Sequence, residues 1–139
     1  MPHSEVVSGR SMLMIMAGLL GATAVALGAF HAHGMDERLA MSGLDAATVE
    51  YRMELCSTGL KYQLAHAVAI LAVALAARVK PGPLWSVAGT AMVLGTLLFS
   101  GSLYGIAATG ISKLGAITPL GGLCLIISWL MVTIVGFRR

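Results

Sequence analysis

The chain has 139 residues, of which 58% are hydrophobic and 11% are charged, and its mean hydropathy is +0.88. Soluble domains average about 25% charged residues, so this composition excludes an ordinary water-soluble globule and indicates an integral membrane protein. The net charge of +3 comes from scattered residues. Nucleic-acid binding requires basic residues clustered on one face, so we expect no nucleic-acid partner.

Four apolar stretches are long enough to cross a bilayer, which requires about 20 helical residues. They predict spanning helices over about residues 11–33, 60–79, 84–109 and 117–137 of a single transmembrane domain, residues 1–139. The first stretch could instead be a cleaved signal peptide, because a basic residue precedes it and Ala24-Val25-Ala26 resembles a cleavage site, but its apolar run exceeds the usual ~7–15 residues. The sequence therefore predicts an all-α, polytopic membrane protein built as a four-helix bundle.

The longest polar break, residues 34–59, cannot span a membrane but contains a helical pattern over about residues 45–58. Asp45 can cap this helix, and a narrow apolar stripe follows it, consisting of Val49, Met53 and Cys56. Such a stripe is typical of a helix that rests on a membrane surface or on another helix. We expect a short interfacial helix that leads into the second span.

The connection between the second and third spans contains Pro81-Gly82-Pro83, which predicts a tight hairpin because proline lacks an amide donor and has a fixed φ. Basic residues favour the cytoplasmic side of a membrane. The side with the termini and this hairpin has a net charge of +4, from Arg10, Arg78, Lys80, Arg138 and Arg139 against Glu5, and the other side has −1. We expect a protein of the cell inner (plasma) membrane with both termini cytoplasmic.

Polar residues within the spans concentrate near the outer side. The expected cluster, structural or ligand-binding, consists of His33, Tyr62, Gln63, His66, Ser100, Ser102, Tyr104 and Thr118. Isolated polar groups in hydrocarbon are costly unless paired, so these segments should face one another rather than lipid. We expect His66 to be the central residue, bonded to groups in residues 100–104 or near His33.

Small residues at four-residue spacing allow close helix packing in membranes. Gly101 and Gly105 form such a pair in the third span, Gly18 and Ala22 offer the same spacing in the first, and Gly121 is a further expected packing position. Gly105→Leu should therefore destabilise the bundle.

The residues indicate no catalytic or metal site. Ser100 and Ser102 have no acid beside them, and Cys56 and Cys124 lack metal-ligand spacing. His31 and His33 point to opposite faces of an intact helix, so they converge on a metal or haem only if Gly34 unwinds the helix end. We therefore expect no cofactor, and we interpret His66 as structural, with a metal, haem or proton-relay role as the alternative.

The runs LGAFHAHG from Leu27, YQLAHA from Tyr62, LFSGSLY from Leu98 and ITPLGG from Ile117, followed by a tryptophan at Trp129, form an ordered set. Over most of the chain, this set resembles the YgdD/YwdK-like family of small membrane proteins of unknown function. His31 stands where the usual family motif has a small residue, so the resemblance carries over no role to it. The resemblance implies a four-helix membrane protein without an established reaction.

Two functions remain open. The first is a non-catalytic accessory, stabilising or scaffold component of a membrane assembly, whose partners are the bilayer and other membrane-protein subunits or further copies of the chain. The alternative is a small oligomeric transport or ligand-binding module that uses the outward polar cluster. The absence of any Asp or Glu within the four spans argues against a proton relay through a single protomer.

Overall fold

The computed structural model describes residues 9–137. These residues form five α-helices and one short 3₁₀ helix, and no strand occurs among them. The elements are α1 (Gly9–His33), α2 (Met35–Ala40), α3 (Ala46–Val79), α4 (Pro83–Thr109), η1 (Ser112–Ala116) and α5 (Thr118–Phe137). Within this part of the chain, α1, α3, α4 and the η1–α5 segment are long and apolar enough to cross a membrane. The all-α, four-span fold class is confirmed.

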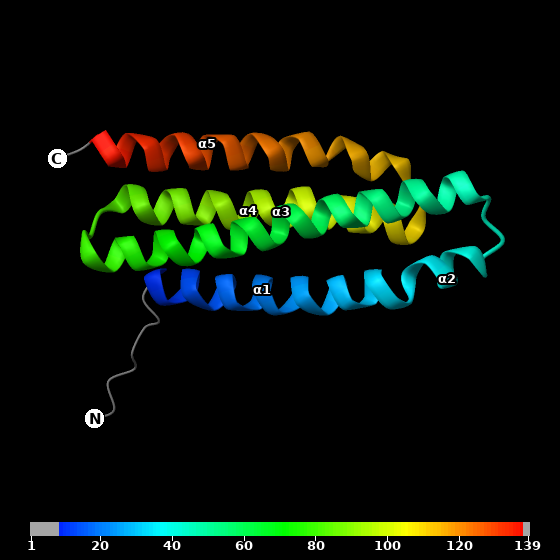
Figure 1. Cartoon of the computed structure of the whole chain (residues 1–139). Helices are drawn as coiled ribbons and strands as arrows, with labels where there is room; N and C mark the ends of the chain where they lie inside the picture. Colours follow the sequence, from blue (N-terminus) through cyan, green and yellow to red (C-terminus); the bar gives the residue numbers. More distant parts are fainter. Residues whose placement is uncertain (1–8, 138–139) are drawn as a thin grey trace, which may run out of the picture.

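The four long helices lie roughly side by side in chain order, with α1 and α5 at the two ends of the row (Figure 1). Helices α1 and α3, α3 and α4, and α4 and α5 pack together, whereas no Cα atoms of α1 and α5 lie within 8 Å of each other. The start of α1, the end of α5 and the α3–α4 connection lie at one end of the molecule, called here the end with the termini (Figure 1). The inner helices α3 and α4 therefore form the centre of the bundle.

The segment around residues 46–58 differs from the expected short interfacial helix. It is the first part of α3, which continues without interruption for 34 residues and is about 51 Å long. Its start is determined by Asp45, whose side chain accepts a hydrogen bond from the Thr48 amide. No proline interrupts the helix, so the polar and apolar parts of α3 form a single element.

Helix α2 is an element that the sequence reasoning missed. It has six residues and buries Met35 and Leu39. These side chains pack with Cys56 of α3 and Ala107 of α4 in a hydrophobic cluster at the end of the bundle opposite the termini. The side chains of α2 in this second cluster cover one side of the beginning of α3.

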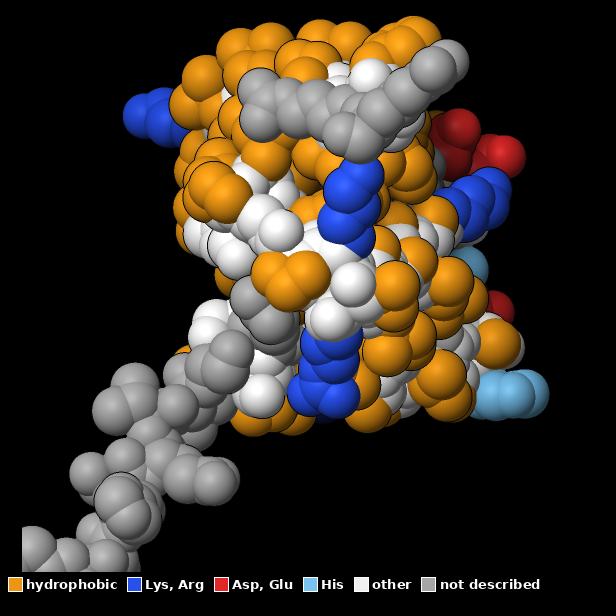
Figure 2. All heavy atoms as spheres, turned by 90° about the vertical axis from the view of Figure 1, so that its left-hand side faces the viewer, with side chains coloured by type: hydrophobic (Ala, Val, Ile, Leu, Met, Phe, Trp, Pro, Cys, Tyr) orange, Lys and Arg blue, Asp and Glu red, His pale blue; other side chains and the backbone are white. Residues whose placement is uncertain are grey.

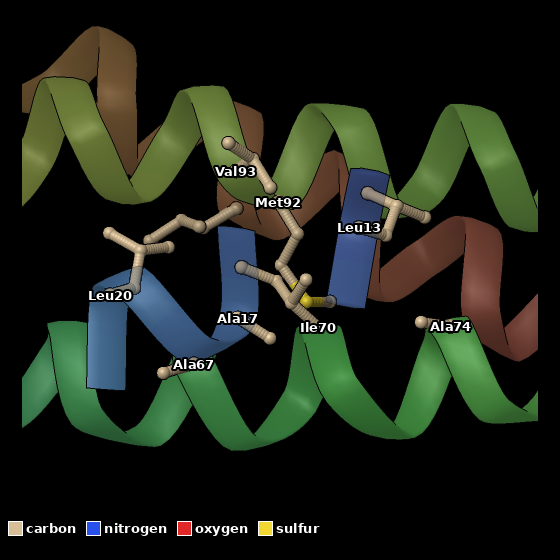
Figure 3. Close-up of a cluster of buried hydrophobic side chains, with 9 residues drawn as sticks. Leu13, Ala17, Leu20, Ala67, Ile70, Ala74, Met92 and Val93 are labelled. Carbon is tan, nitrogen blue, oxygen red and sulfur yellow. The ribbon is translucent and has the colours of Figure 1, made fainter. Parts of the chain in front are cut away.

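The main core lies between all four long helices. Figure 3 shows side chains from α1, α3 and α4 meeting there, and Leu125 adds a contribution from α5. Ile70 and Met92 are fully buried at its centre. Alanines, such as Ala67 and Ala74 of α3, bring the helix backbones close together.

The end of the molecule that carries the termini has basic side chains. Lys and Arg residues project there from a surface that is otherwise largely hydrophobic, and acidic residues appear only at its margin (Figure 2). Arg78 and Lys80 are exposed beside the connection in which α3 ends at Val79 and α4 begins at Pro83. The comparison of net charge between the two sides of the membrane also counts Glu5, Arg138 and Arg139, which lie outside the described residues.

Candidate functional site: a hydrogen-bonded polar cluster

Gln63 joins three helices within the membrane-spanning part of the bundle. Its amide nitrogen donates to the carbonyl oxygen of Leu20 and to the hydroxyl of Thr23, both at 2.8 Å, and both in α1. Its amide oxygen accepts from the Tyr104 hydroxyl of α4 at 2.7 Å. The side chain is 4% exposed, so these bonds are formed away from solvent. Gln63, rather than His66, is the central residue of the cluster.

Tyr104 reaches Gln63 because Gly59 leaves room for its ring. A Cβ at Gly59 would lie 2.7 Å from Cε1 of Tyr104. Side chains lean toward the N-terminus of their own helix, so the ring extends back along α4 and places its hydroxyl beside residue 63, one turn after residue 59 on α3. Ser100, one turn before Tyr104, donates to the Gly59 carbonyl oxygen at 2.8 Å. The Ser100–Gly59 and Tyr104–Gln63 hydrogen bonds thus connect α3 and α4 at two adjacent helical turns.

Helices α4 and α5 are connected at two depths. Ser102 and Thr118 form a hydroxyl–hydroxyl bond of 2.7 Å near the end of the bundle opposite the termini. Ser128, which is fully buried, donates to the carbonyl oxygen of Ala88 at 2.9 Å in the half nearer the termini. The second bond lies in the half of the bundle for which the sequence suggested only apolar contacts.

The expected partners of His66, in residues 100–104 or near His33, are wrong. Its Nδ1 lies 2.8 Å from the Tyr62 carbonyl oxygen of the same helix, and its Nε2 accepts from the Trp129 indole of α5 at 3.2 Å. Because indole N–H can only donate, Nε2 must be unprotonated and Nδ1 must carry the hydrogen. The ring thus connects two helices that are not neighbours in the row.

Tyr62 contributes its ring and its backbone to the cluster. Its ring packs against Phe99 of α4 with centroids 4.4 Å apart and is stacked with the His66 ring at 6.0 Å. The side chain is 44% exposed. This group of rings lies on the face where α3, α4 and α5 meet.

The two histidines at the end of α1 are in different environments. His31 is half-buried, and its Nε2 lies 3.0 Å from the carbonyl oxygen of Met53 in α3. His33 is exposed and takes no part in the cluster. Within residues 9–137, no group of three or more His, Cys, Asp or Glu side chains could hold a metal ion.

The glycines differ in what surrounds them. A Cβ at Gly121 of α5 would meet the backbone of Phe99 in α4 and would lie 2.9 Å from the Gly95 carbonyl oxygen, so two backbones approach closely there. At Gly105, a Cβ would lie 2.7 Å from Leu114 of η1. Gly101 has no atom within 4 Å and is exposed, in contrast to the expected packing position. Residue spacing shows that two glycines share a helix face, but it does not show where that face points.

All buried side-chain nitrogen and oxygen atoms among the described residues have a hydrogen-bond partner. Most of these partners lie on another helix, so the cluster holds the helices in register. The hydroxyls of Ser100 and Ser102 bond to carbonyl or hydroxyl oxygens, and neither bonds to a histidine that could serve as a base. The interhelical hydrogen bonds of this arrangement stabilise the packing of the helices.

Sequence reasoning missed Thr23 and Ser128, and it noted Trp129 only as part of a motif. Each is a hydrogen-bonding side chain in an otherwise apolar helix, and such residues often form interhelical bonds in membranes. The sequence therefore contained this signal for Thr23 and for Ser128. The partner of each depends on helix rotation, for which the sequence gives little information.

The sequence pattern of a protein family of unknown function, DUF423, matches residues 27–122. The chain belongs to this family. Relatives of similar length include the UPF0382 membrane protein YwdK of Bacillus subtilis, which is 38% identical over 129 residues covering 91% of this chain and 97% of the relative. A Haemophilus influenzae membrane protein is 35% identical over 93% of this chain and 96% of its own length. The inner membrane protein YgdD of Escherichia coli K12 is 34% identical over 91% and 89%.

The family resemblance is confirmed, and with it the membrane setting. The DUF423 pattern runs from Leu27 in α1 to Gly122 in α5. It includes Gln63, Ser100 and Tyr104 but ends before Trp129. No solved structure matches the chain.

Proposed function

We propose that this DUF423 protein is a non-catalytic accessory or stabilising component of a membrane assembly. In this proposal it resides in the inner (plasma) membrane with both termini cytoplasmic. Two observations support this location and orientation. The relative YgdD is named an inner membrane protein, and basic residues lie beside the α3–α4 connection. The partner is another membrane-protein subunit or a second copy of the chain.

The observation that carries the proposal is the outward face of α1. Gly18, Ala22 and Ala26 are exposed and follow one another at four-residue spacing. A Cβ at Gly18 would have no atom within 4 Å. Small residues at this spacing favour close contact between membrane helices, and the protomer does not use them for its own packing. They are therefore available to a helix of another chain.

The positions of α1 and α5 agree with this role. In the most apolar stretch of α1, and in that of the η1–α5 segment, 22% of the residues are buried inside the protomer. The corresponding shares are 44% in α3 and 50% in α4. Lipid covers exposed apolar faces without any need for small residues, so the Gly18–Ala26 stripe favours a protein neighbour at α1. Large exposed side chains, such as Val25 of α1 and Leu130 of α5, suit contact with lipid.

The internal use of the polar side chains supports a structural role over the alternative of a transport module. A pathway for a polar solute requires side chains that are free to exchange partners with that solute. The amide nitrogen of Gln63 donates both of its hydrogens, to Leu20 and Thr23, and its amide oxygen accepts from Tyr104. One acceptor site of the amide oxygen is all that is left for a solute. The cluster is accordingly better suited to connecting helices than to passing a solute between them.

The test is photo-cross-linking in native membranes with a photoreactive amino acid at Ala22. The matched control carries it at Val68, which is 63% exposed on α3. We expect a protein adduct of one discrete mass from position 22 and only lipid adducts from position 68. An adduct of twice the chain mass identifies a second copy as the partner.

A second variant makes the result decisive. Gly18→Leu should abolish the adduct at position 22 without lowering the free energy of unfolding, because the added side chain meets open space within the protomer. Lipid adducts alone at position 22, or an adduct that survives Gly18→Leu, would contradict the proposal.

A further inference from the structure

A pocket with a volume of about 360 Å³ lies at the end of the bundle opposite the termini. This volume is within the range of ~300–1,000 Å³ that is typical of ligand sites. Helices α1, α2, α3 and α4 line it, together with the turn after α2; the lining residues are Leu27, Phe30, Met35, Arg38, Leu39, Ser42, Cys56, Tyr104, Ala107 and Ala108. It is separate from the small-residue stripe of α1.

The floor of this pocket is apolar. Its buried lining residues are Met35, Leu39, Cys56 and Ala107. The Tyr104 hydroxyl is already engaged as a donor to Gln63, so it faces the pocket with its ring rather than with a free polar group. A ligand in the floor must therefore be a hydrocarbon.

The exposed lining residues differ on the two sides of the mouth. Phe30 and Ala108 belong to the spanning helices α1 and α4, and they are apolar. Arg38 and Ser42 belong to α2 and the turn after it, where the chain changes from apolar to charged residues. The mouth thus has an apolar side, formed by the spanning helices, and a polar side, formed by α2 and the turn after it.

Arg38 gives the mouth a positive charge. Among the interactions of the described residues, those of Arg38 involve its backbone only: its amide donates to Gly34, and its carbonyl oxygen accepts from Ser42. The two acids that precede it, Asp36 and Glu37, do not line the pocket. A guanidinium in this position can form paired hydrogen bonds with phosphate oxygens.

We propose that this pocket binds one acyl chain of an anionic membrane phospholipid, with the lipid phosphate held by Arg38. The apolar floor takes the tail, the exposed residues of α1 and α4 let it enter sideways from the bilayer, and α2 covers it. Binding would connect α2 to the spanning helices, since Met35 and Leu39 would contact the same tail as Tyr104.

The test is native mass spectrometry of the purified full-length protein in detergent, with phosphatidylglycerol and phosphatidylcholine of identical acyl chains at equal concentration. We expect one bound lipid, with phosphatidylglycerol favoured about fivefold, the effect of one basic side chain near an anionic lipid. Arg38→Gln should remove this preference. Lys113→Gln, which removes an exposed charge outside the pocket, should leave the preference unchanged.

A variant that fills the pocket tests the position of the tail. Ala108→Trp places a large ring at the exposed mouth and should reduce binding of both lipids at least tenfold, whereas Ala32→Trp, at an exposed alanine outside the pocket, should not. Thermal melting in detergent checks that both variants are folded, and Arg38→Gln gives an independent result should Ala108→Trp unfold. Equal retention of the two lipids by the unmodified protein, or equal binding by both tryptophan variants, would overturn the proposal.

Discussion

At the scale of single residues, Gln63 shows how one side chain can hold a membrane bundle together. An amide has both donors and an acceptor, so it can satisfy groups on two other helices at the same time. The backbone carbonyl of Leu20, the Thr23 hydroxyl and the Tyr104 hydroxyl all bond to it. No ionised group is needed, which avoids the cost of placing a charge in hydrocarbon.

Gln63→Leu should therefore destabilise the protein by roughly 2 kcal/mol, because three interhelical bonds of about 0.6 kcal/mol each are lost. Tyr104→Phe removes one of them and should cost about 0.6 kcal/mol. Unfolding in a denaturing detergent measures both, and the double variant should cost less than the sum. A Gln63→Leu protein as stable as the parent would show that these bonds do not stabilise the bundle.

His66 and Trp129 form a second residue-scale connection, between α3 and α5. His66→Leu removes the acceptor, and Trp129→Phe removes the donor. A double-mutant cycle should give a coupling energy of about 0.5–1 kcal/mol, the range for an interhelical bond in a membrane. His66→Gln keeps an acceptor and should retain more stability than His66→Leu, and additive single effects would contradict the bond.

At the scale of the elements, helices α4 and α5 cross where two glycines face each other. Gly95 and Gly121 allow the backbones to approach, and Leu125 fills the next position along α5. Since the contact is with the backbone of Phe99, a side chain at residue 121 cannot be accommodated by a change of rotamer. The two helices would have to separate.

Gly121→Ala should therefore cost roughly 1–3 kcal/mol through overpacking, reduced by the ~1 kcal/mol that alanine gains over glycine in a helix. Gly101→Ala is the matched control, because it is exposed in α4 and has open space around it. That control should be neutral or slightly stabilising in the same unfolding measurement. Equal effects of the two substitutions would mean that the α4–α5 crossing lies elsewhere.

The start of α3 depends on Asp45, an N-cap whose two carboxylate oxygens accept bonds from the amide and the hydroxyl of Thr48. These bonds lower the pKa of Asp45 below its usual value of 3.8. Because the folded pKa is lower than the unfolded one, the stabilisation is complete above about pH 3.8 and is lost as the pH falls through the lowered folded pKa.

We expect the Thr48 amide to lose protection from hydrogen exchange as the pH is lowered through that range, relative to amides in the middle of α3. Asp45→Asn keeps an acceptor but does not titrate, so protection at Thr48 should no longer depend on this carboxyl group. Asp45→Ala should leave the amide unprotected at every pH. If protection of the Thr48 amide in the unmodified protein depends on pH no more than in Asp45→Asn, the carboxylate is not the cap.

At the scale of the whole molecule, an even number of spans brings both termini to the same end of the bundle (Figure 1). We propose the cytoplasmic side for them, because Arg78 and Lys80 accompany the short α3–α4 connection. We expect a reporter fused after residue 139 to be active in the cytoplasm and one inserted after Ser42 to be active outside. The reverse pattern would invert the topology and move the lipid pocket to the inner leaflet.

The sequence by itself determined the four spans and the breaks between them. The thickness of the bilayer sets the minimum length of a spanning helix, and the Pro81-Gly82-Pro83 run separates α3 from α4 through local geometry alone. Ser100, Gln63 and Tyr104, which the sequence singled out, each form a hydrogen bond between α3 and α4. The tertiary structure decided which side chains pair, as with His66 and Trp129, and which glycines are enclosed, as with Gly121 rather than Gly101. The reason is that helices apolar on nearly all sides carry little information about their rotation, which is set only when side-chain shapes and hydrogen bonds are matched between neighbours.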